Sequence, residues 1–237
     1  MELRPFAQAA TYIAGEARRS VQERGFFNLV LAGGATPRGV YERLASHELR
    51  AQVPWERVRV FWGDERLVPR DHPASNYRMA REALLGRVPL SEQNVFPVPA
   101  DAPTAEEAAR KYEGTLRELF PGAVLPAFDL VLLGLGADGH TASLFPGGPE
   151  CEERTRWCVA SLAPPESPPR ERVTLTLPAL NAARAVAFLV AGEDKRSVLT
   201  AVLRPGPEAE LPARRIRAAE GGLRAAGAVL LFTDLLP

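Results

Sequence analysis

The feature that most constrains the fold of this chain is the alternation of short apolar runs with stretches of helical periodicity. The runs are rich in Val, Leu, Phe and Ala, as buried strands are, and the stretches between them are long enough for helices. This alternation is typical of a mainly parallel sheet that helices cover on both faces. With 237 residues, 46% of them hydrophobic, the chain can bury a sizeable core. We therefore expect one α/β domain over residues 1–237.

The expected elements follow from these patterns and from Gly and Pro punctuation. The expected strands are Asn28–Ala32, Val58–Trp62, Phe128–Leu133, Val173–Leu177, Ala185–Ala191 and Ala228–Phe232. The expected helices are Pro5–Arg24, Pro37–Ser46, Asn76–Leu85, Thr104–Leu119 and Asp194–Leu203. The proline-dense stretch 164–169 should be a mobile loop that covers a crevice.

Charge and hydropathy argue against several classes of function. The 29 basic and 29 acidic residues balance and no basic block stands out, so nothing favours nucleic-acid binding. No apolar run approaches the roughly 20 residues that cross a bilayer, and the amphipathic start is unlike a signal peptide. We expect a cytoplasmic protein without nucleic-acid or membrane partners, acting as a monomer or a small homo-oligomer.

The cysteines and histidines give no sign of a metal or redox centre. Cys151 and Cys158 are spaced as neither a redox pair nor a zinc pair, so both should be reduced and structural. The histidines His47, His72 and His140 are too scattered along the chain to suggest a metal site. We expect neither a metal nor a cofactor.

Residues 134–147 (GLGADGHTASLFPG) form a glycine-rich loop directly after the apolar run 128–133. The glycines allow a sharp turn and a close approach of the backbone to a ligand. Asp138 and His140 then lie where a strand ends, and in open α/β sheets ligands bind beyond the carboxyl ends of the strands. His140 is the leading candidate for a general base, because an imidazole is largely unprotonated yet still basic near neutral pH. The alternative is a structural histidine bonded within its own loop.

The same stretch also fits G-x-G-x-x-G, the fingerprint of dinucleotide-binding loops. That fingerprint opens a long helix and is followed, about 20 residues on, by an acid that ends a second strand. Here residues 145–149 (FPGGP) stop any helix soon after the loop, and Glu152 and Glu153 follow no strand-like run. The pattern therefore argues against a dehydrogenase.

A second candidate loop follows the first strand, at residues 31–38 (LAGGATPR). We expect Thr36 to be the N-cap and Pro37 the first residue of the next helix. Gly33 and Gly34 free the turn, so several backbone N–H groups can point at one anion, helped by the helix dipole. This pattern is compatible with a phosphate site and also with an ordinary strand-to-helix turn. The loop lacks the ending of a Walker loop, which argues against nucleotide triphosphate hydrolysis.

A third polar cluster, residues 63–66 (GDER) followed by residues 71–77 (DHPASNY), comes after the strand at 58–62. Alone it would be an ordinary solvated turn. Because loops that follow several strands can converge in one crevice, the three clusters together favour a polar pocket for an anionic small molecule.

Taken in order, these motifs resemble the 6-phosphogluconolactonase family, which shares a superfamily with glucosamine-6-phosphate isomerase/deaminase. The resemblance rests on GGATP, WGDERLVP with DHPASNY, GLGADGHTASLFP, RVTLTLPALN and VAGEDK, which span residues 31 to about 203. It implies a Rossmann-like α/β fold without a nucleotide. It also implies hydrolysis of a sugar-phosphate lactone, 6-phospho-D-glucono-1,5-lactone, to 6-phospho-D-gluconate.

The resemblance implies roles for individual residues. His140 would be the general base that takes a proton from the water attacking the lactone carbonyl. Asp138 would orient or polarise the imidazole, with Asp64 as a second candidate for that work. Either Arg66 or a backbone N–H of the glycine loop would stabilise the oxyanion.

The phosphate site is implied in the same way. Gly33, Gly34 and Thr36 would hold the phosphate group, and Arg172 and Lys195 would close over it. Lys195 stands out because it is one of the chain's two lysines.

Two alternatives share parts of this pattern. The isomerase/deaminase pattern continues D-G-H-I-A-F-N-E-P, with a glutamate five residues after the histidine to assist ring opening, but Phe145 stands there in this chain. Its Met-Asp-Glu-Tyr turn is also replaced, by residues 63–66 (GDER), and both differences favour the lactonase. A non-catalytic sugar-phosphate sensor would carry a helix-turn-helix, for which the early strand at Asn28 leaves no room.

Overall fold

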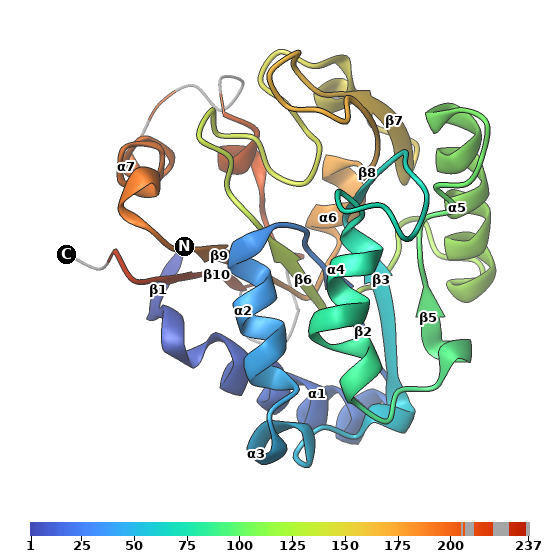
Figure 1. The fold of residues 1–237 in the computed structure, drawn as a ribbon, viewed down its shortest axis with the longest axis vertical. Coiled ribbons are helices and arrows are strands. Elements are labelled where there is room, and N and C mark those ends of the chain that lie inside the picture. Colours follow the sequence, from blue (N-terminus) through green and yellow to red (C-terminus); the bar gives the residue numbers. More distant parts are fainter. Residues whose placement is uncertain (205, 207–210, 220–227, 236–237) are drawn as a thin grey trace.

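The computed structural model describes residues 1–204, 206, 211–219 and 228–235 of the chain. Its centre is a seven-stranded sheet in which neighbouring strands run parallel (Figure 1). In spatial order the strands are β1 (Glu2–Pro5), β10 (Ala228–Thr233), β9 (Ala185–Val190), β6 (Leu130–Leu133), β2 (Phe27–Leu31), β3 (Val58–Trp62) and β5 (Val95–Phe96). The predicted α/β fold with a mainly parallel sheet is confirmed.

A second, three-stranded antiparallel sheet contains β4 (Asp64–Arg66), β8 (Glu171–Leu175) and β7 (Cys158–Leu162), in that spatial order. Gly63 connects the two sheets, because its N–H donates to Leu31 at 3.0 Å and its carbonyl accepts from Leu175 at 2.8 Å. The strand predicted over 173–177 belongs to this small sheet and ends at Leu175. One antiparallel partner, β7, directly precedes it in the chain, but the other, β4, comes from a segment far away in the sequence, so local pattern could not assign the strand to this sheet.

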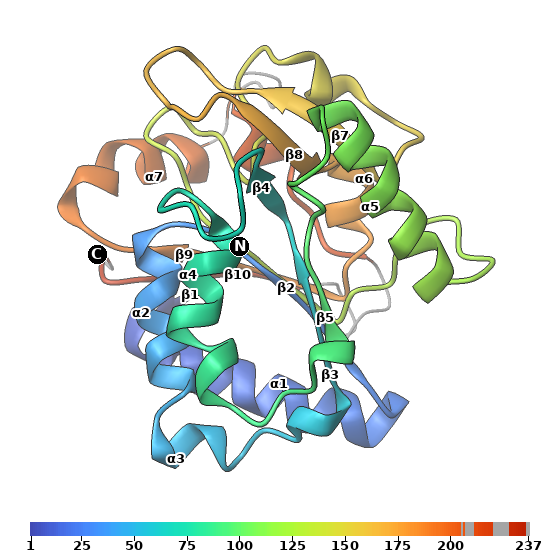
Figure 2. The same cartoon turned by 45° about the vertical axis from the view of Figure 1, so that its right-hand side comes forward.

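Helices flank the large sheet on both sides (Figure 2). α2 (Ala35–Leu44) and α4 (Asn76–Ala83) pack together on one side of β2 and β3, and α5 (Ala105–Leu119) lies on the other side. The remaining helices are α1 (Ala9–Arg24), α3 (His47–Arg50), α6 (Leu177–Asn181) and α7 (Arg196–Leu203). Within the described ranges, no helix is long and apolar enough to cross a membrane.

The predicted starts of the first two helices are wrong. The helix predicted from Pro5 begins at Ala9, because Pro5 still belongs to the edge strand β1, which pairs with β10, and a 3₁₀ turn over Phe6–Gln8 follows it. The predicted N-cap at Thr36 is also incorrect, since α2 begins at Ala35 and Gly34 is its N-cap, without a side-chain cap. Gly34 has a φ of 98°, which glycine adopts without strain, so the chain turns into the helix earlier than the Thr-Pro signal suggests.

Two buried tyrosines fix the carboxyl ends of β2 and β3. The Tyr41 hydroxyl accepts the N–H of Ala32 at 2.9 Å and donates to the carbonyl of the same residue at 2.9 Å. The Tyr112 hydroxyl makes the equivalent pair with Trp62, at 2.9 and 3.1 Å. Each hydroxyl satisfies both backbone groups where the ladder stops, so the loops that follow start from fixed points.

Candidate active site

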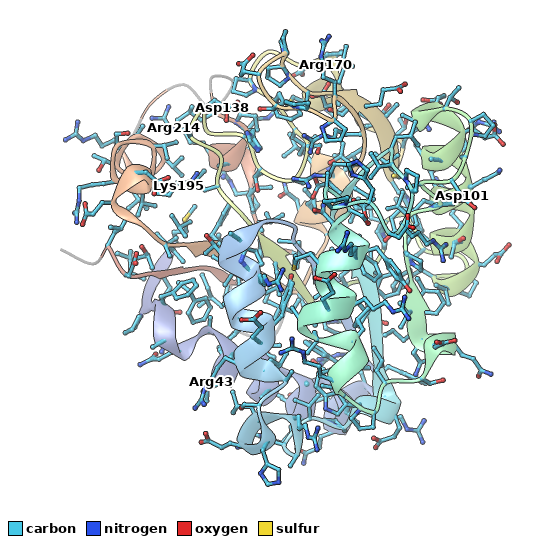
Figure 3. The ribbon with its side chains drawn as sticks, viewed as in Figure 1. Arg43, Asp101, Asp138, Arg170, Lys195 and Arg214 are labelled. Atoms are coloured by element: carbon cyan, nitrogen blue, oxygen red, sulfur yellow. The ribbon has the colours of Figure 1, made fainter. Side chains whose placement is uncertain are left out.

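The loops that follow β2, β3, β6 and β9 surround a cavity of about 470 Å³. All the predicted site residues except Asp138 line it, namely Gly33, Gly34, Thr36, Asp64, Arg66, His140, Arg172 and Lys195. Asp138 contacts His140 directly. Figure 3 shows Asp138 and Lys195 at the same end of the molecule, away from Arg43. The fold therefore brings together the residues that the motifs singled out.

His140 and Asp138 form a hydrogen-bonded pair after β6. The Nδ1 of His140 lies 2.6 Å from Oδ1 of Asp138, and the backbone N–H of His140 donates to the same oxygen at 3.1 Å. Burial pushes the pKa of Asp138 upward, but the hydrogen bonds from His140 outweigh it, and the net pKa lies below the ordinary value. The carboxylate is therefore ionised near neutral pH, and as an acceptor it favours a proton on Nδ1 of the imidazole.

The loop around His140 is tightly built. A Cβ atom placed on Gly136 would lie 2.1 Å from Nδ1 of His140, so only glycine leaves room for the ring. On its other side the imidazole packs on Phe145, with ring centroids 4.8 Å apart. Ala142, which also lines the cavity, has a φ of 49°, an unusual value for a residue with a side chain. Gly136, Asp138 and Phe145 thus all border the imidazole.

Asp64 lies in the same cavity but has a different partner. Its Oδ2 accepts the hydroxyl hydrogen of Ser143 at 2.7 Å, and the residue is 8% exposed. Ser143 is in turn fully buried, and its carbonyl accepts from Ser161 at 2.6 Å. Of the two candidates for orienting the imidazole, Asp138 makes the hydrogen bond, whereas Asp64 connects the small sheet to the His140 loop.

The Gly33–Gly34 turn supplies free backbone donors. The N–H groups of Gly33 and Gly34 donate to no acceptor in the part of the chain that the structure describes. The first N–H groups of α2, at Ala35 and Thr36, also lack partners inside the helix, as at any helix N-terminus. The side chain of Thr36 does not cap the helix and faces the cavity wall. This turn is suited to an anion.

Arg66 and Arg172 lie directly opposite each other on β4 and β8. Arg66 donates to the carbonyl of Ala74 at 2.6 Å, and Arg172 to the carbonyls of Pro169 and Ser167 at 2.6 and 2.9 Å. Burial lowers the pKa of Arg172, and the neighbouring charge of Arg66 lowers it further. Neither guanidinium forms an ion pair with a carboxylate within the described residues, so the two positive charges together favour binding of an anion.

Lys195 approaches the cavity from the end of β9. It belongs to a 3₁₀ turn over Glu193–Lys195 that precedes α7, so the helix predicted over 194–203 starts later than expected. Its ammonium lies 3.8 Å from the exposed carboxylate of Asp194, a weak pair in water. The amine therefore remains available to a ligand.

Sequence reasoning missed two buried polar residues of this site, Asn76 and Ser143. Asn76 is the first residue of α4 and lines the cavity, and the DHPASNY motif contains it without marking it as special. Glu65, next to Asp64, has a structural task instead: it accepts the N–H groups of Asn76 and Tyr77 at 2.8 and 2.7 Å. Burial raises the pKa of Glu65 despite these hydrogen bonds.

The described residues contain no cluster of His, Cys, Asp and Glu side chains that could hold a metal ion. The two cysteines, Cys151 and Cys158, are free and buried. Independently of this, the imidazole, carboxylates and cationic side chains around the cavity suit acid–base chemistry on an anionic ligand.

Comparison with known proteins gives a consistent set of relatives. A family model described as glucosamine-6-phosphate isomerases/6-phosphogluconolactonase matches residues 4–225. The chain is 42% identical over 213 residues to the 6-phosphogluconolactonase of Synechocystis, covering 89% of this chain and 85% of that protein. It is 36% identical over 227 residues to a probable 6-phosphogluconolactonase of Oryza sativa, covering 90% and 80% of the two chains.

Solved structures agree with these relatives. The 6-phosphogluconolactonase of Thermotoga maritima matches with a TM-score of 0.81 at 33% identity, covering 98% of this chain and 97% of that chain. A monomeric glucosamine-6-phosphate deaminase matches with a TM-score of 0.79 at 20% identity, covering 99% and 98%. The deaminase therefore shares the fold, whereas the closer sequence similarity is to the lactonases.

Proposed function

The chain belongs to the glucosamine-6-phosphate isomerase/6-phosphogluconolactonase family, and we propose how its cavity hydrolyses 6-phospho-D-glucono-1,5-lactone to 6-phospho-D-gluconate. The observation that carries the proposed mechanism is the 2.6 Å pair of His140 and Asp138 beside free backbone N–H groups and cationic side chains. The names of the relatives support the same substrate.

His140 is the general base. Because Asp138 accepts the proton on Nδ1, the lone pair of Nε2 takes a proton from water while the water oxygen bonds to the lactone carbonyl carbon. The carbonyl electrons move onto its oxygen. When this tetrahedral intermediate collapses, the bond to the ring oxygen breaks and that oxygen takes the proton back from Nε2. The product carries a carboxyl group and a new hydroxyl group.

The oxyanion is assigned to backbone donors of the His140 loop. Leu135 and Ala137 line the cavity, and their N–H groups donate to no acceptor within the described ranges. They lie on the same loop as the base, and donors fixed in advance stabilise developing charge well. We therefore assign Arg66 to the phosphate and not to the oxyanion.

The phosphate is assigned to the Gly33–Gly34 turn and the three cations. Arg66 and Arg172 face each other, so they act on one anionic group, and Arg66 also lines a smaller hollow together with Gly34. Lys195 reaches the cavity from β9. A phosphate group with its charge close to −2 suits this concentration of donors.

The lactonase is favoured over the deaminase by the residue that touches the base. The glutamate of the deaminase pattern is replaced by Phe145, which is 5% exposed and packs on the His140 ring. Ring opening and proton transfer on a carbon acid need a second placed group, whereas lactone hydrolysis needs one base, water and an oxyanion donor. We expect no deamination of glucosamine-6-phosphate.

The proposed mechanism is tested by measuring hydrolysis of freshly generated 6-phosphogluconolactone above its spontaneous background. His140→Asn should lower turnover by about 100-fold or more, while binding of 6-phosphogluconate stays within a few-fold. Full turnover in this variant would exclude His140 as the base. No turnover by the native chain, in a sample that still binds 6-phosphogluconate, would instead favour a sugar-phosphate sensor.

We propose that the protein acts as a monomer or a small homo-oligomer, since the residues to which the mechanism assigns roles lie around one cavity of a single chain. The free, buried thiols of Cys151 and Cys158 support a reducing compartment such as the cytoplasm. The proline-dense loop over 164–169 connects β7 to β8 and is tied to Arg172, which supports its proposed role as a cover for bound substrate.

A further inference from the structure

Asn76 is a buried polar residue in the cavity wall to which the mechanism assigns no task. It follows the N-cap Ser75 at the start of α4 and is 1% exposed. Its backbone N–H donates to Glu65 at 2.8 Å, and its side-chain Nδ2 donates to the carbonyl of Asp64 at 2.9 Å. Asn76 is therefore fixed to strand β4 by its backbone and its side chain.

The other side of the Asn76 carboxamide faces Gly33. A Cβ atom on Gly33 would lie 2.0 Å from Oδ1, 2.3 Å from Cγ and 2.5 Å from Nδ2 of Asn76. The carboxamide thus occupies the space that a side chain at position 33 would need. By contrast, a Cβ atom on the neighbouring Gly34 would meet nothing within 4 Å. Of the two glycines, Gly33 is therefore the one that lies against Asn76.

The contact between Asn76 and Gly33 uses no hydrogen bond. Oδ1 of Asn76 is buried and has no hydrogen-bond partner within the described residues, which is unusual for a buried carboxamide. Asn181 shows the ordinary arrangement, since its Nδ2 donates to Arg215 at 3.0 Å and its Oδ1 accepts from Arg217 at 2.8 Å. Packing without a hydrogen bond supports the loop and leaves the N–H groups of the loop free for a ligand.

We propose that Asn76 is a positioning residue that sets the distance between the phosphate-binding turn at Gly33 and the acid strand at Asp64. The inference rests on the proposed function, in which the phosphate binds at that turn. A phosphate held there fixes the far end of the lactone, so the position of the turn decides whether the carbonyl carbon meets His140. Asn76 selects substrates by the separation of their phosphate and lactone groups.

A reciprocal pair of substitutions tests the contact. In Gly33→Ala the new methyl group would lie 2.0 Å from Oδ1 of Asn76. An ordinary non-bonded separation is about 3.5 Å, so the turn must move away from Asn76 by roughly 1.5 Å. We expect KM for 6-phosphogluconolactone to rise about 100-fold. In the Asn76→Ala background the methyl group enters vacated space, so adding Gly33→Ala should change KM by less than about threefold. An equal fold-change in KM when Gly33→Ala is added to the native chain and to the Asn76→Ala variant would overturn the proposal.

The Asn76→Ala variant alone separates positioning from a merely structural role. KM for 6-phosphogluconolactone should rise about 10-fold while kcat falls less, and glucono-1,5-lactone, which lacks the phosphate, should be hydrolysed as by the native chain. Equal losses with both lactones would contradict positioning. Asn181→Ala is the matched control, because it should lower the melting temperature and leave KM unchanged for both lactones.

Binding and stability keep this test independent of turnover. If the native chain hydrolyses no lactone, the native chain, the two single variants and the double variant are titrated with 6-phosphogluconate. The loss of affinity that Gly33→Ala causes in the native chain should then disappear in the Asn76→Ala background. If none of them binds it, the melting temperatures should still be non-additive, since the clash exists without ligand. Additive melting temperatures would then exclude the contact itself.

Discussion

Gly136→Ala should lower kcat strongly without removing any functional group. The added Cβ atom would lie 2.1 Å from Nδ1 and 2.2 Å from Cε1 of His140, and 2.7 Å from Oδ1 of Asp138. An ordinary non-bonded contact is about 3.5 Å, so the imidazole must move by roughly 1.4 Å. That shift breaks the 2.6 Å hydrogen bond that fixes its tautomer. A displacement of about 1 Å can cost about 100-fold in rate, which is about 2.7 kcal/mol of activation free energy.

The assay is kcat for 6-phosphogluconolactone, corrected for spontaneous opening, together with calorimetric binding of 6-phosphogluconate. We expect kcat to fall about 100-fold while product affinity changes by less than about threefold, because the phosphate turn is untouched. Gly134→Ala is the matched control: it lies in the same loop, and its Cβ atom would meet nothing within 4 Å. It should retain native kcat.

Native kcat in Gly136→Ala would refute the reasoning, since the ring would then work equally well in a displaced position. A loss of the same size in Gly134→Ala would also refute it, because any change in the loop would then be harmful. Folding of both variants is checked by thermal melting, and a large shift in Gly136→Ala alone would assign the loss to stability instead.

Three further predictions concern charge and stability. Arg172→Ala should raise KM for 6-phosphogluconolactone and spare glucono-1,5-lactone; equal effects on both would exclude the phosphate assignment. Tyr41→Phe leaves both backbone groups of Ala32 without the hydroxyl, so urea unfolding should show a loss of roughly 1–3 kcal/mol, and an unchanged midpoint would contradict this. Backbone N–H groups, that of Arg156 first, lower the pKa of Glu153 to about 2. The ionised side chain therefore stabilises the folded state at pH values above its ordinary pKa of 4.5, and this stabilisation is lost as the pH falls towards 2. Glu153→Gln should therefore have a lower free energy of unfolding than the native chain at neutral pH, and urea unfolding should show this difference shrinking as the pH falls from 4.5 towards 2. A difference that stays constant over this pH range would contradict a stabilising role of the ionised carboxylate.

The sequence by itself determined the fold class, the five inner strands of the large sheet, and the loops that carry the chemistry, whereas the edge strands β1 and β5 were not predicted. These features depend on residues close together in the chain: apolar runs that form buried strands, and glycines that allow the turn before His140. The Asp138–His140 pair belongs to the same class, because two positions in one loop are enough to bring both groups into contact.

Only the tertiary structure decided the contacts between segments that are distant in sequence. Pattern alone could not place Arg66 opposite Arg172, because that register depends on how two short strands meet. The contact of Asn76 with Gly33 and the hydrogen bond of Ser143 with Asp64 likewise join different loops. Such contacts form only when the whole sheet fixes the loops relative to one another, and a local pattern contains no information about that arrangement.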